Sequence, residues 1–219
     1  MNPGTQLRRW WLALLLALAT AVGAQAAPRP VILVLGDSLS AEYGLPRDSG
    51  WVKRLADRLT ARAPAGGAQY SVVNASISGE TTSGGRTRLP ALLAQYRPAV
   101  VVLELGANDG LRGLSLAAMR DNLVFMVDAS RKAGARVLVV GLRIPPNYGR
   151  EYGERFFSTF ADVARDRKVA LAPFLLDGFA EQPGMFQPDR IHPTVEAQPR
   201  MLDNVWPHLE PLLGPAAKR

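Results

Sequence analysis

The sequence predicts a three-layer α/β sandwich in which a mostly parallel sheet lies between two layers of helices. Two observations support this fold. Short apolar runs rich in β-branched residues recur along the chain, and longer segments of helical period separate them. Parallel strands need crossover connections, which cover both faces of the sheet with helices and leave the strands almost wholly apolar. With 219 residues, the chain is long enough for one such domain and too short for two ordinary ones.

The first 26 residues are typical of a secretory signal peptide. Arg8 and Arg9 precede an apolar stretch over residues 10–22, and Ala-Gln-Ala at residues 24–26 is a small-x-small cleavage site. A permanent membrane anchor is the alternative, but the stretch is shorter than the roughly 20 residues that span a bilayer. We therefore expect one mature domain over residues 27–219, exported across the inner membrane to the periplasm without a stable membrane anchor.

Five apolar runs are the expected strands, and they cover residues 31–35, 70–73, 100–105, 137–140 and 169–172. Two of the segments between them have one apolar face, because their large apolar residues repeat at helical spacing. These residues are Leu116, Met119, Leu123 and Met126, and then Tyr152, Phe156, Phe160 and Val163. We interpret both sets as core.

The last predicted helix covers about residues 194–213 and contains Pro199 and Pro207. Proline in a helix interior removes a backbone hydrogen bond and clashes with the preceding turn. We therefore expect these prolines to kink or interrupt the helix.

The charge pattern indicates a solvated basic surface better than a nucleic-acid-binding site. The formal net charge is +7, and it falls to +5 in the mature chain because the leader holds two basic and no acidic residues. The arginines are scattered, without a basic run or a basic stripe interleaved with aromatic residues. We expect no nucleic-acid partner and a monomeric protein.

A serine stands directly after the first expected strand, in the sequence Gly-Asp-Ser-Leu at residues 36–39. In open α/β sheets, ligands bind outside the carboxyl ends of the strands. The Ser38 hydroxyl would be exposed there as a candidate nucleophile. A turn or helix-capping serine is the alternative, since Gly-Asp-Ser also makes a good turn.

The chain has two histidines, and His192 is the better candidate for a general base. It follows Asp189 by three residues in a loop or first helical turn, where both side chains can point the same way. The carboxylate can then hold Nδ1–H and leave Nε2 free to take the serine proton. We interpret His208, beside Trp206 and Pro207 in the last helix, as a packing or solvent-facing residue.

Glycine and asparagine follow the second and third expected strands. Gly79 lies within residues 74–81 and Asn108 within residues 105–110. A tetrahedral oxyanion needs fixed hydrogen-bond donors at about 3 Å, which a glycine N–H and an asparagine amide can supply. Ordinary turn chemistry is the alternative for both residues.

These segments resemble, in the same order, the four conserved blocks of the SGNH, or GDSL, hydrolase family. The blocks match residues 36–40, 78–81, 106–109 and 189–193. Residues 73–79, 108–113 and 146–149 are similar to a narrower group, the secreted bacterial multifunctional esterases described as acyl-CoA thioesterase I, protease I, lysophospholipase and arylesterase. Two departures from that group are Ala107, where glycine is common, and Glu80, where aspartate is common.

The resemblance implies a five-stranded parallel sheet of the flavodoxin-like SGNH type. It implies Ser38 as nucleophile, His192 as base and Asp189 as the residue that orients the base. The implied oxyanion donors are the Ser38 N–H, the Gly79 N–H and the Asn108 amide, and the family needs no metal and no cofactor. The implied substrates are acyl esters and thioesters, lysophospholipids among them.

The resemblance also places part of the acyl groove in the loop over residues 143–148. Ile144, Pro145 and Tyr148 would line the groove there. The alternative is that Pro145 and Pro146 merely stiffen an exposed loop.

Two rival functions are considered, one within the enzymes and one of another class. A carbohydrate O-deacetylase of the same superfamily would carry the same blocks, but the candidate loops have no cluster of stacking aromatic residues. A non-catalytic acyl- or lipid-binding module would usually lack a triad member, and here all three are present. A nucleophile-elbow hydrolase is excluded because the chain has no Gly-x-Ser-x-Gly. Two distant histidines and no cysteine leave few ligands for a catalytic zinc.

Overall fold

The computed structural model of the protein describes residues 29–62 and 70–214, so the predicted signal peptide lies outside the described residues. Five strands form one parallel sheet in the order β2-β1-β3-β4-β5. Their bounds are Val31–Gly36 for β1, Ser71–Asn74 for β2, Val100–Glu104 for β3, Arg136–Val140 for β4 and Ala170–Ala172 for β5. The prediction of a parallel sheet and its strand positions is confirmed.

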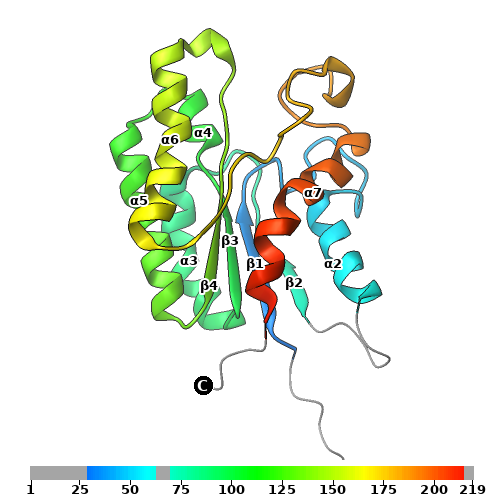
Figure 1. Cartoon of the computed structure of the whole chain (residues 1–219), viewed down its shortest axis with the longest axis vertical. Helices are drawn as coiled ribbons and strands as arrows, with labels where there is room; N and C mark the ends of the chain where they lie inside the picture. The colour runs from blue at the N-terminus through cyan, green and yellow to red at the C-terminus, as the bar shows by residue number, and fades with distance from the viewer. Residues whose placement is uncertain (1–28, 63–69, 215–219) are drawn as a thin grey trace, which may run out of the picture.

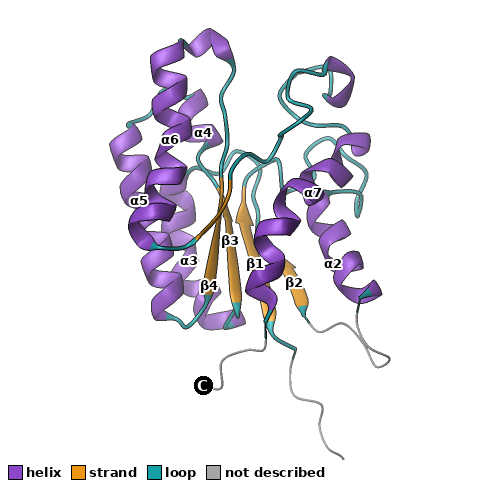
Figure 2. Cartoon of the chain, viewed as in Figure 1, coloured by secondary structure: helices purple, strands orange, loops and turns teal. Residues whose placement is uncertain are grey.

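Helices cover both faces of the sheet, as Figures 1 and 2 show. One layer holds α3, α5 and α6, which pack side by side, and the other holds α2 and α7. Their bounds are Trp51–Ala61 for α2, Thr82–Tyr96 for α3, Leu116–Lys132 for α5, Arg150–Arg167 for α6 and Gln198–Leu209 for α7. The predicted three-layer sandwich is therefore confirmed.

The two predicted helix faces point into the core. Met119, Leu123 and Met126 of α5 are fully buried. In α6, the rings of Phe156 and Phe160 are buried and meet edge to face with centroids 5.3 Å apart, a favourable aromatic geometry. The first residue of each set, Leu116 or Tyr152, is only half-buried, because it lies near the helix end.

The expected disruption at Pro199 does not occur. Residues Val195–Ala197 form a separate 3₁₀ turn, and α7 begins at Gln198, so Pro199 occupies the first helical turn. A first-turn N–H has no intrahelical acceptor, and proline is tolerated there for that reason. Pro207 does lie inside α7, and the helix gives way two residues later to the 3₁₀ turn Glu210–Leu213.

The register of the central strands places the candidate residues at one edge of the sheet. Gly36, the last residue of β1, pairs with Glu104, the last residue of β3. Val34 of β1 pairs with Asn74, the last residue of β2. The loops that carry Ser38, Gly79 and Asn108 therefore start from neighbouring strand ends.

Within the two described stretches, every helix is too short or too polar to cross a bilayer.

Candidate active site

Ser38 lies in a tight turn immediately after β1. The Asp37 side chain closes this turn, because its Oδ1 accepts the Leu39 N–H at 3.0 Å, as in an Asx turn. The Asp37 carbonyl accepts the N–H groups of Ser40 and Ala41 at 3.2 and 2.9 Å. These hydrogen bonds fix the backbone around Ser38, and Ser38 itself is half-buried.

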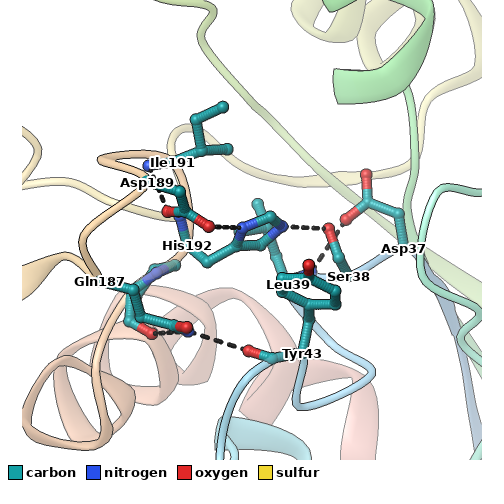
Figure 3. A network of polar contacts seen from close by, with 9 residues as sticks. Asp37, Ser38, Leu39, Tyr43, Gln187, Asp189, Ile191 and His192 are labelled. Carbon is teal, nitrogen blue, oxygen red and sulfur yellow. Dashed lines mark hydrogen bonds and ion pairs between the residues drawn. The ribbon is translucent and has the colours of Figure 1, made fainter.

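The structure brings the three predicted triad residues into one hydrogen-bonded row (Figure 3). His192 Nε2 lies 2.8 Å from the Ser38 hydroxyl, and His192 Nδ1 lies 2.7 Å from Asp189 Oδ2. A carboxylate only accepts, so Nδ1 carries the proton and Nε2 is the acceptor that faces the serine. This geometry lets the imidazole take the serine proton.

Backbone and side-chain contacts hold the loop that carries Asp189 and His192. Asp189 Oδ1 accepts the N–H groups of Ile191 and His192 at 2.9 and 3.0 Å. The Gln187 N–H donates to the His192 carbonyl at 2.8 Å, and the Gln187 side chain donates to the Tyr43 carbonyl at 2.9 Å. The Tyr43 ring also lies 4.4 Å from the imidazole, centroid to centroid. Gln187 and Tyr43 thereby fix the loop that carries His192 against the turn that carries Ser38 (Figure 3).

Asp189 is held in its charged form. Partial burial would raise its pKa, but hydrogen bonds from the His192 backbone and ring and from the Ile191 N–H outweigh that effect and lower the pKa to about 2. Asp189 therefore stays a carboxylate at neutral and mildly acidic pH, where it can stabilise an imidazolium on His192.

Asn108 joins three loops at the strand ends. It lies in the short helix α4, Ala107–Leu111, which begins after Gly106, whose φ of 129° lies outside the range that other residues favour. The Asn108 amide nitrogen donates to Asp37 Oδ2 at 3.2 Å and to the Glu80 carbonyl at 3.0 Å. It therefore lies beside Asp37 and Glu80, which follow or precede the predicted site residues Ser38 and Gly79 directly in the chain.

The Ser38 and Gly79 N–H groups are the two backbone donors predicted for the oxyanion. Within the described residues, neither the Ser38 N–H nor the Gly79 N–H has a hydrogen-bond partner. Gly79 has a φ of 80°, which favours glycine. The Ile77 N–H donates to the Gly36 carbonyl at 3.1 Å and holds the Gly79 loop against the end of β1.

Two arginines that sequence reasoning missed brace the Gly79 loop. Arg112 donates to the Gly79 carbonyl at 3.0 Å. Arg88 pairs with the Glu80 carboxylate at 2.7 Å and donates to the Ala75 carbonyl at 3.0 Å. The side chain of Glu80, one of the two departures from the resembled group, thus anchors the loop. The sequence carries no signal for either contact, because each joins segments whose approach depends on the fold.

Ile144, Pro145 and Tyr148 lie in the loop after β4 and in its 3₁₀ turn, Pro146–Tyr148. Ile144 is half-buried, whereas Pro145 and Tyr148 are exposed. The Tyr148 hydroxyl donates to the Leu111 carbonyl at 2.9 Å, which fixes this loop to the end of α4. The loop therefore lies beside the helix of Asn108, although no hydrogen bond links these three residues to the triad.

Two buried carboxyl groups behind Ser38 were also missed. Burial raises the pKa of Asp37 to about 7, with further rises from Asp109 and Glu80, while hydrogen bonds from Leu39 and Asn108 oppose the shift. Burial raises the pKa of Glu104 well above its usual value, and the charge of Asp37 adds to this. A single acidic residue inside the apolar run 100–105 was the signal that could have identified Glu104.

We expect Asp37 to make the fold less stable as the pH rises from about 4 to about 7. In the unfolded chain its carboxyl ionises near pH 4, whereas the folded protein keeps it protonated up to about pH 7. The folded state then binds more protons across this window, so the free energy of unfolding falls with pH. The slope of the unfolding temperature against pH across this window should be weaker in Asp37→Asn than in the wild type. The exposed-site control Asp121→Asn should keep the wild-type slope, and equal slopes in all three proteins would contradict the expectation.

Among the described residues, no group of three or more histidine, aspartate or glutamate side chains is placed to hold a metal ion. A serine, a histidine and an aspartate in a row at the strand ends of a parallel α/β sandwich is the arrangement of a serine hydrolase.

Comparison with known proteins identifies the family. Residues 34–198 match the GDSL-like Lipase/Acylhydrolase family, and the chain belongs to that family of hydrolases. Esterase TesA of Pseudomonas aeruginosa is 51% identical over 203 residues, which cover 92% of this chain and 99% of that protein. Thioesterase 1/protease 1/lysophospholipase L1 of Escherichia coli K12 is 38% identical over 206 residues, 94% of this chain and 95% of that protein.

A solved structure agrees with both the fold and the family. The psychrotrophic esterase EstA from Pseudoalteromonas sp., in a form inhibited by monoethylphosphonate, is 41% identical with a TM-score of 0.78. The match covers 84% of this chain and 99% of that one. The resemblance to the narrower esterase group is therefore confirmed.

Proposed function

We propose that the protein hydrolyses carboxylic esters and thioesters through an acyl-enzyme formed on Ser38. The row from Ser38 through His192 to Asp189 carries this proposal. His192 takes the serine proton while the hydroxyl oxygen attacks the acyl carbonyl. It then gives that proton to the leaving group, and a water molecule activated in the same way releases the acid.

The oxyanion of each tetrahedral intermediate would be held by the Ser38 N–H, the Gly79 N–H and the Asn108 amide. Two of these donors are unpaired within the described residues. The Asn108 amide would exchange its 3.2 Å bond to Asp37 for a bond to the oxyanion. Fixed donors of this kind stabilise charge that develops only on the way to the transition state.

The substrates are proposed to be small acyl compounds, with lysophospholipids and acyl thioesters among them. The names of the relatives support this range, since they include an esterase, an arylesterase and a thioesterase/lysophospholipase. Ile144, Pro145 and Tyr148 are proposed to contact the acyl chain from the loop beside α4.

A substrate panel tests the proposed function. We expect the purified protein to hydrolyse p-nitrophenyl esters from acetyl to medium acyl chains, acyl-CoA and lysophospholipid, with Ser38→Ala as the blank. A strict preference for acetyl groups on sugars would instead favour the carbohydrate O-deacetylase. Hydrolysis that persists in the Ser38→Ala blank would overturn the mechanism.

We propose that residues 1–26 direct the chain to the periplasm and are removed, leaving residues 27–219 as one hydrolase domain. The basic start, the apolar stretch and the Ala-Gln-Ala site support this. Amino-terminal sequencing of the protein recovered from a periplasmic extract is expected to begin near Ala27. A protein that retains residues 1–26 and sediments with membranes would contradict the proposal.

The active unit is proposed to be a monomer, because one chain supplies the triad and all three candidate oxyanion donors. Size-exclusion chromatography at assay concentration is expected to give the mass of a single mature chain. Activity that is confined to a larger species would contradict this.

A further inference from the structure

Glu104 ends β3 directly behind the nucleophile turn. Its side chain is fully buried, and its Oε2 accepts two hydrogen bonds. The donors are the Ser40 hydroxyl at 2.7 Å and the Asp37 N–H at 3.3 Å. Because Asp37 and Ser40 lie on either side of Ser38 in the chain, one carboxyl oxygen fixes the turn at both ends.

A buried tryptophan orients the stronger of these bonds. Trp51, the first residue of α2, donates its indole N–H to the Ser40 oxygen at 3.1 Å. The Ser40 hydroxyl proton is then directed to Glu104, since the oxygen already accepts from the indole. The indole, the hydroxyl and the carboxyl form a directed chain that ends beneath Ser38.

The close approach of this carboxyl depends on the glycine before the turn. A Cβ at Gly36 would lie 2.6 Å from Glu104 Oε2 and 2.8 Å from the Ser40 oxygen. Such contacts are sterically forbidden, so Gly36 leaves the space that Glu104 and Ser40 fill. Gly36 and Glu104 also pair across β1 and β3, which places the carboxyl beneath the turn by strand register.

We propose that Glu104 is a positioning residue for the nucleophile, holding the Ser38 turn from the core side as a neutral carboxylic acid. This inference rests on the proposed role of Ser38. Glu104 makes no hydrogen bond or ion pair with the triad side chains in the described structure, so it acts through Asp37 and Ser40. A shift of about 1 Å in a reacting group can lower a rate by about 10²-fold, which is the type of loss that Glu104 prevents.

The neutral form follows from the surroundings of the side chain. Glu104 takes part in no ion pair in the described part of the chain. Its Oε1 is buried without a hydrogen-bond partner there, and the titratable group that faces it is the acidic Asp37. A bare, unpaired carboxylate oxygen in such a place would be strongly unfavourable. A neutral carboxylic acid that acts only by accepting hydrogen bonds on its carbonyl oxygen can be replaced by an amide, because the amide keeps that acceptor.

Two substitutions of similar size test this role. Glu104→Gln keeps a carbonyl acceptor, and we expect it to retain kcat within about threefold. Glu104→Met fills the same space without an acceptor, and we expect kcat to fall about 10- to 100-fold with KM within about twofold. Inactivation by a fluorophosphonate probe should slow in parallel, because the probe reads the reactivity of Ser38 without substrate turnover.

Two controls separate positioning from stability and from the proposed function. Leu138→Ala, at a fully buried site in β4, should lower the unfolding temperature and leave kcat unchanged. Ser38→Ala, assayed alongside, should be inactive; if it is active, the proposed function fails and not the role of Glu104.

With Ser38→Ala inactive, wild-type kcat in Glu104→Met, or an equal loss in Glu104→Gln, would overturn the inference. If Glu104→Met does not fold, Ser40→Ala replaces it, with a severalfold loss of kcat expected and wild-type kcat contradicting the role.

Discussion

Replacing Ser38 or His192 by alanine is expected to abolish ester hydrolysis, with kcat falling by roughly five to six orders of magnitude. In the proposed mechanism, Ser38 supplies the attacking oxygen, and His192 Nε2, 2.8 Å away, removes its proton. Without either group, the acyl-enzyme route is closed, and only the oxyanion donors and substrate binding remain. Initial rates with a p-nitrophenyl ester, on protein checked for folding by circular dichroism, measure the loss.

The chain offers a matched control for each of these variants. Ser130 is a buried serine in α5 whose hydroxyl donates to the Met126 carbonyl at 2.7 Å. His208 is the second of the two histidines of the chain. Ser130→Ala and His208→Ala should retain wild-type kcat. An active Ser38→Ala enzyme, or equal losses in His192→Ala and His208→Ala, would show that the triad is not the catalytic device.

The second large effect is expected at Asn108, where replacement by alanine should lower kcat by roughly 10² to 10³. The amide would donate to the oxyanion, which carries its charge only on the reaction path, so KM should change little. Asn108 also bonds to Asp37 and Glu80 in the resting structure. Steady-state kinetics and thermal unfolding of the same preparation separate the catalytic part from the structural part.

Asn122→Ala is the control for this substitution. The Asn122 amide donates to the Thr82 hydroxyl at 3.1 Å and therefore braces the start of α3, and in the described chain it makes no hydrogen bond to the Ser38 turn. It should lower stability alone. If Asn108→Ala likewise lost stability and kept its kcat, Asn108 would be a loop brace and not an oxyanion donor.

The fold could be predicted because the central strands are apolar on both faces. Val100–Glu104 is buried along its full length. In a chain with intervening amphipathic helices, such a run is expected to form an inner strand of a parallel sheet that helices cover on both faces. Pro199 was misjudged because a helix start depends on where the preceding turn ends. In this fold, the 3₁₀ turn Val195–Ala197 sets that point.

The site was predictable where chemistry restricts the choice of residue. Of the two histidines, His192 was the better candidate base, and Asp189 lies close to it in sequence. Since ligands bind at the carboxyl ends of parallel strands, both residues were expected to approach Ser38. Their catalytic roles stay predictions until variants are measured. Glu104 was missed, because residues 100–105 were interpreted as one apolar strand and its single acidic residue was not considered separately. Its contact with the Ser38 turn exists only through the pairing of β1 with β3.

The activated serine is the central claim, and labelling by a fluorophosphonate probe followed by peptide mass spectrometry tests it most directly. A serine that a neighbouring base activates attacks a phosphorus electrophile as it attacks an acyl carbonyl, so a fluorophosphonate is a suitable reagent. We expect one adduct per chain, on the peptide that contains Ser38, with the labelling rate lowered by roughly three orders of magnitude or more in His192→Ala. An active enzyme that carries its adduct on another residue, or that labels equally fast without His192, would contradict the account.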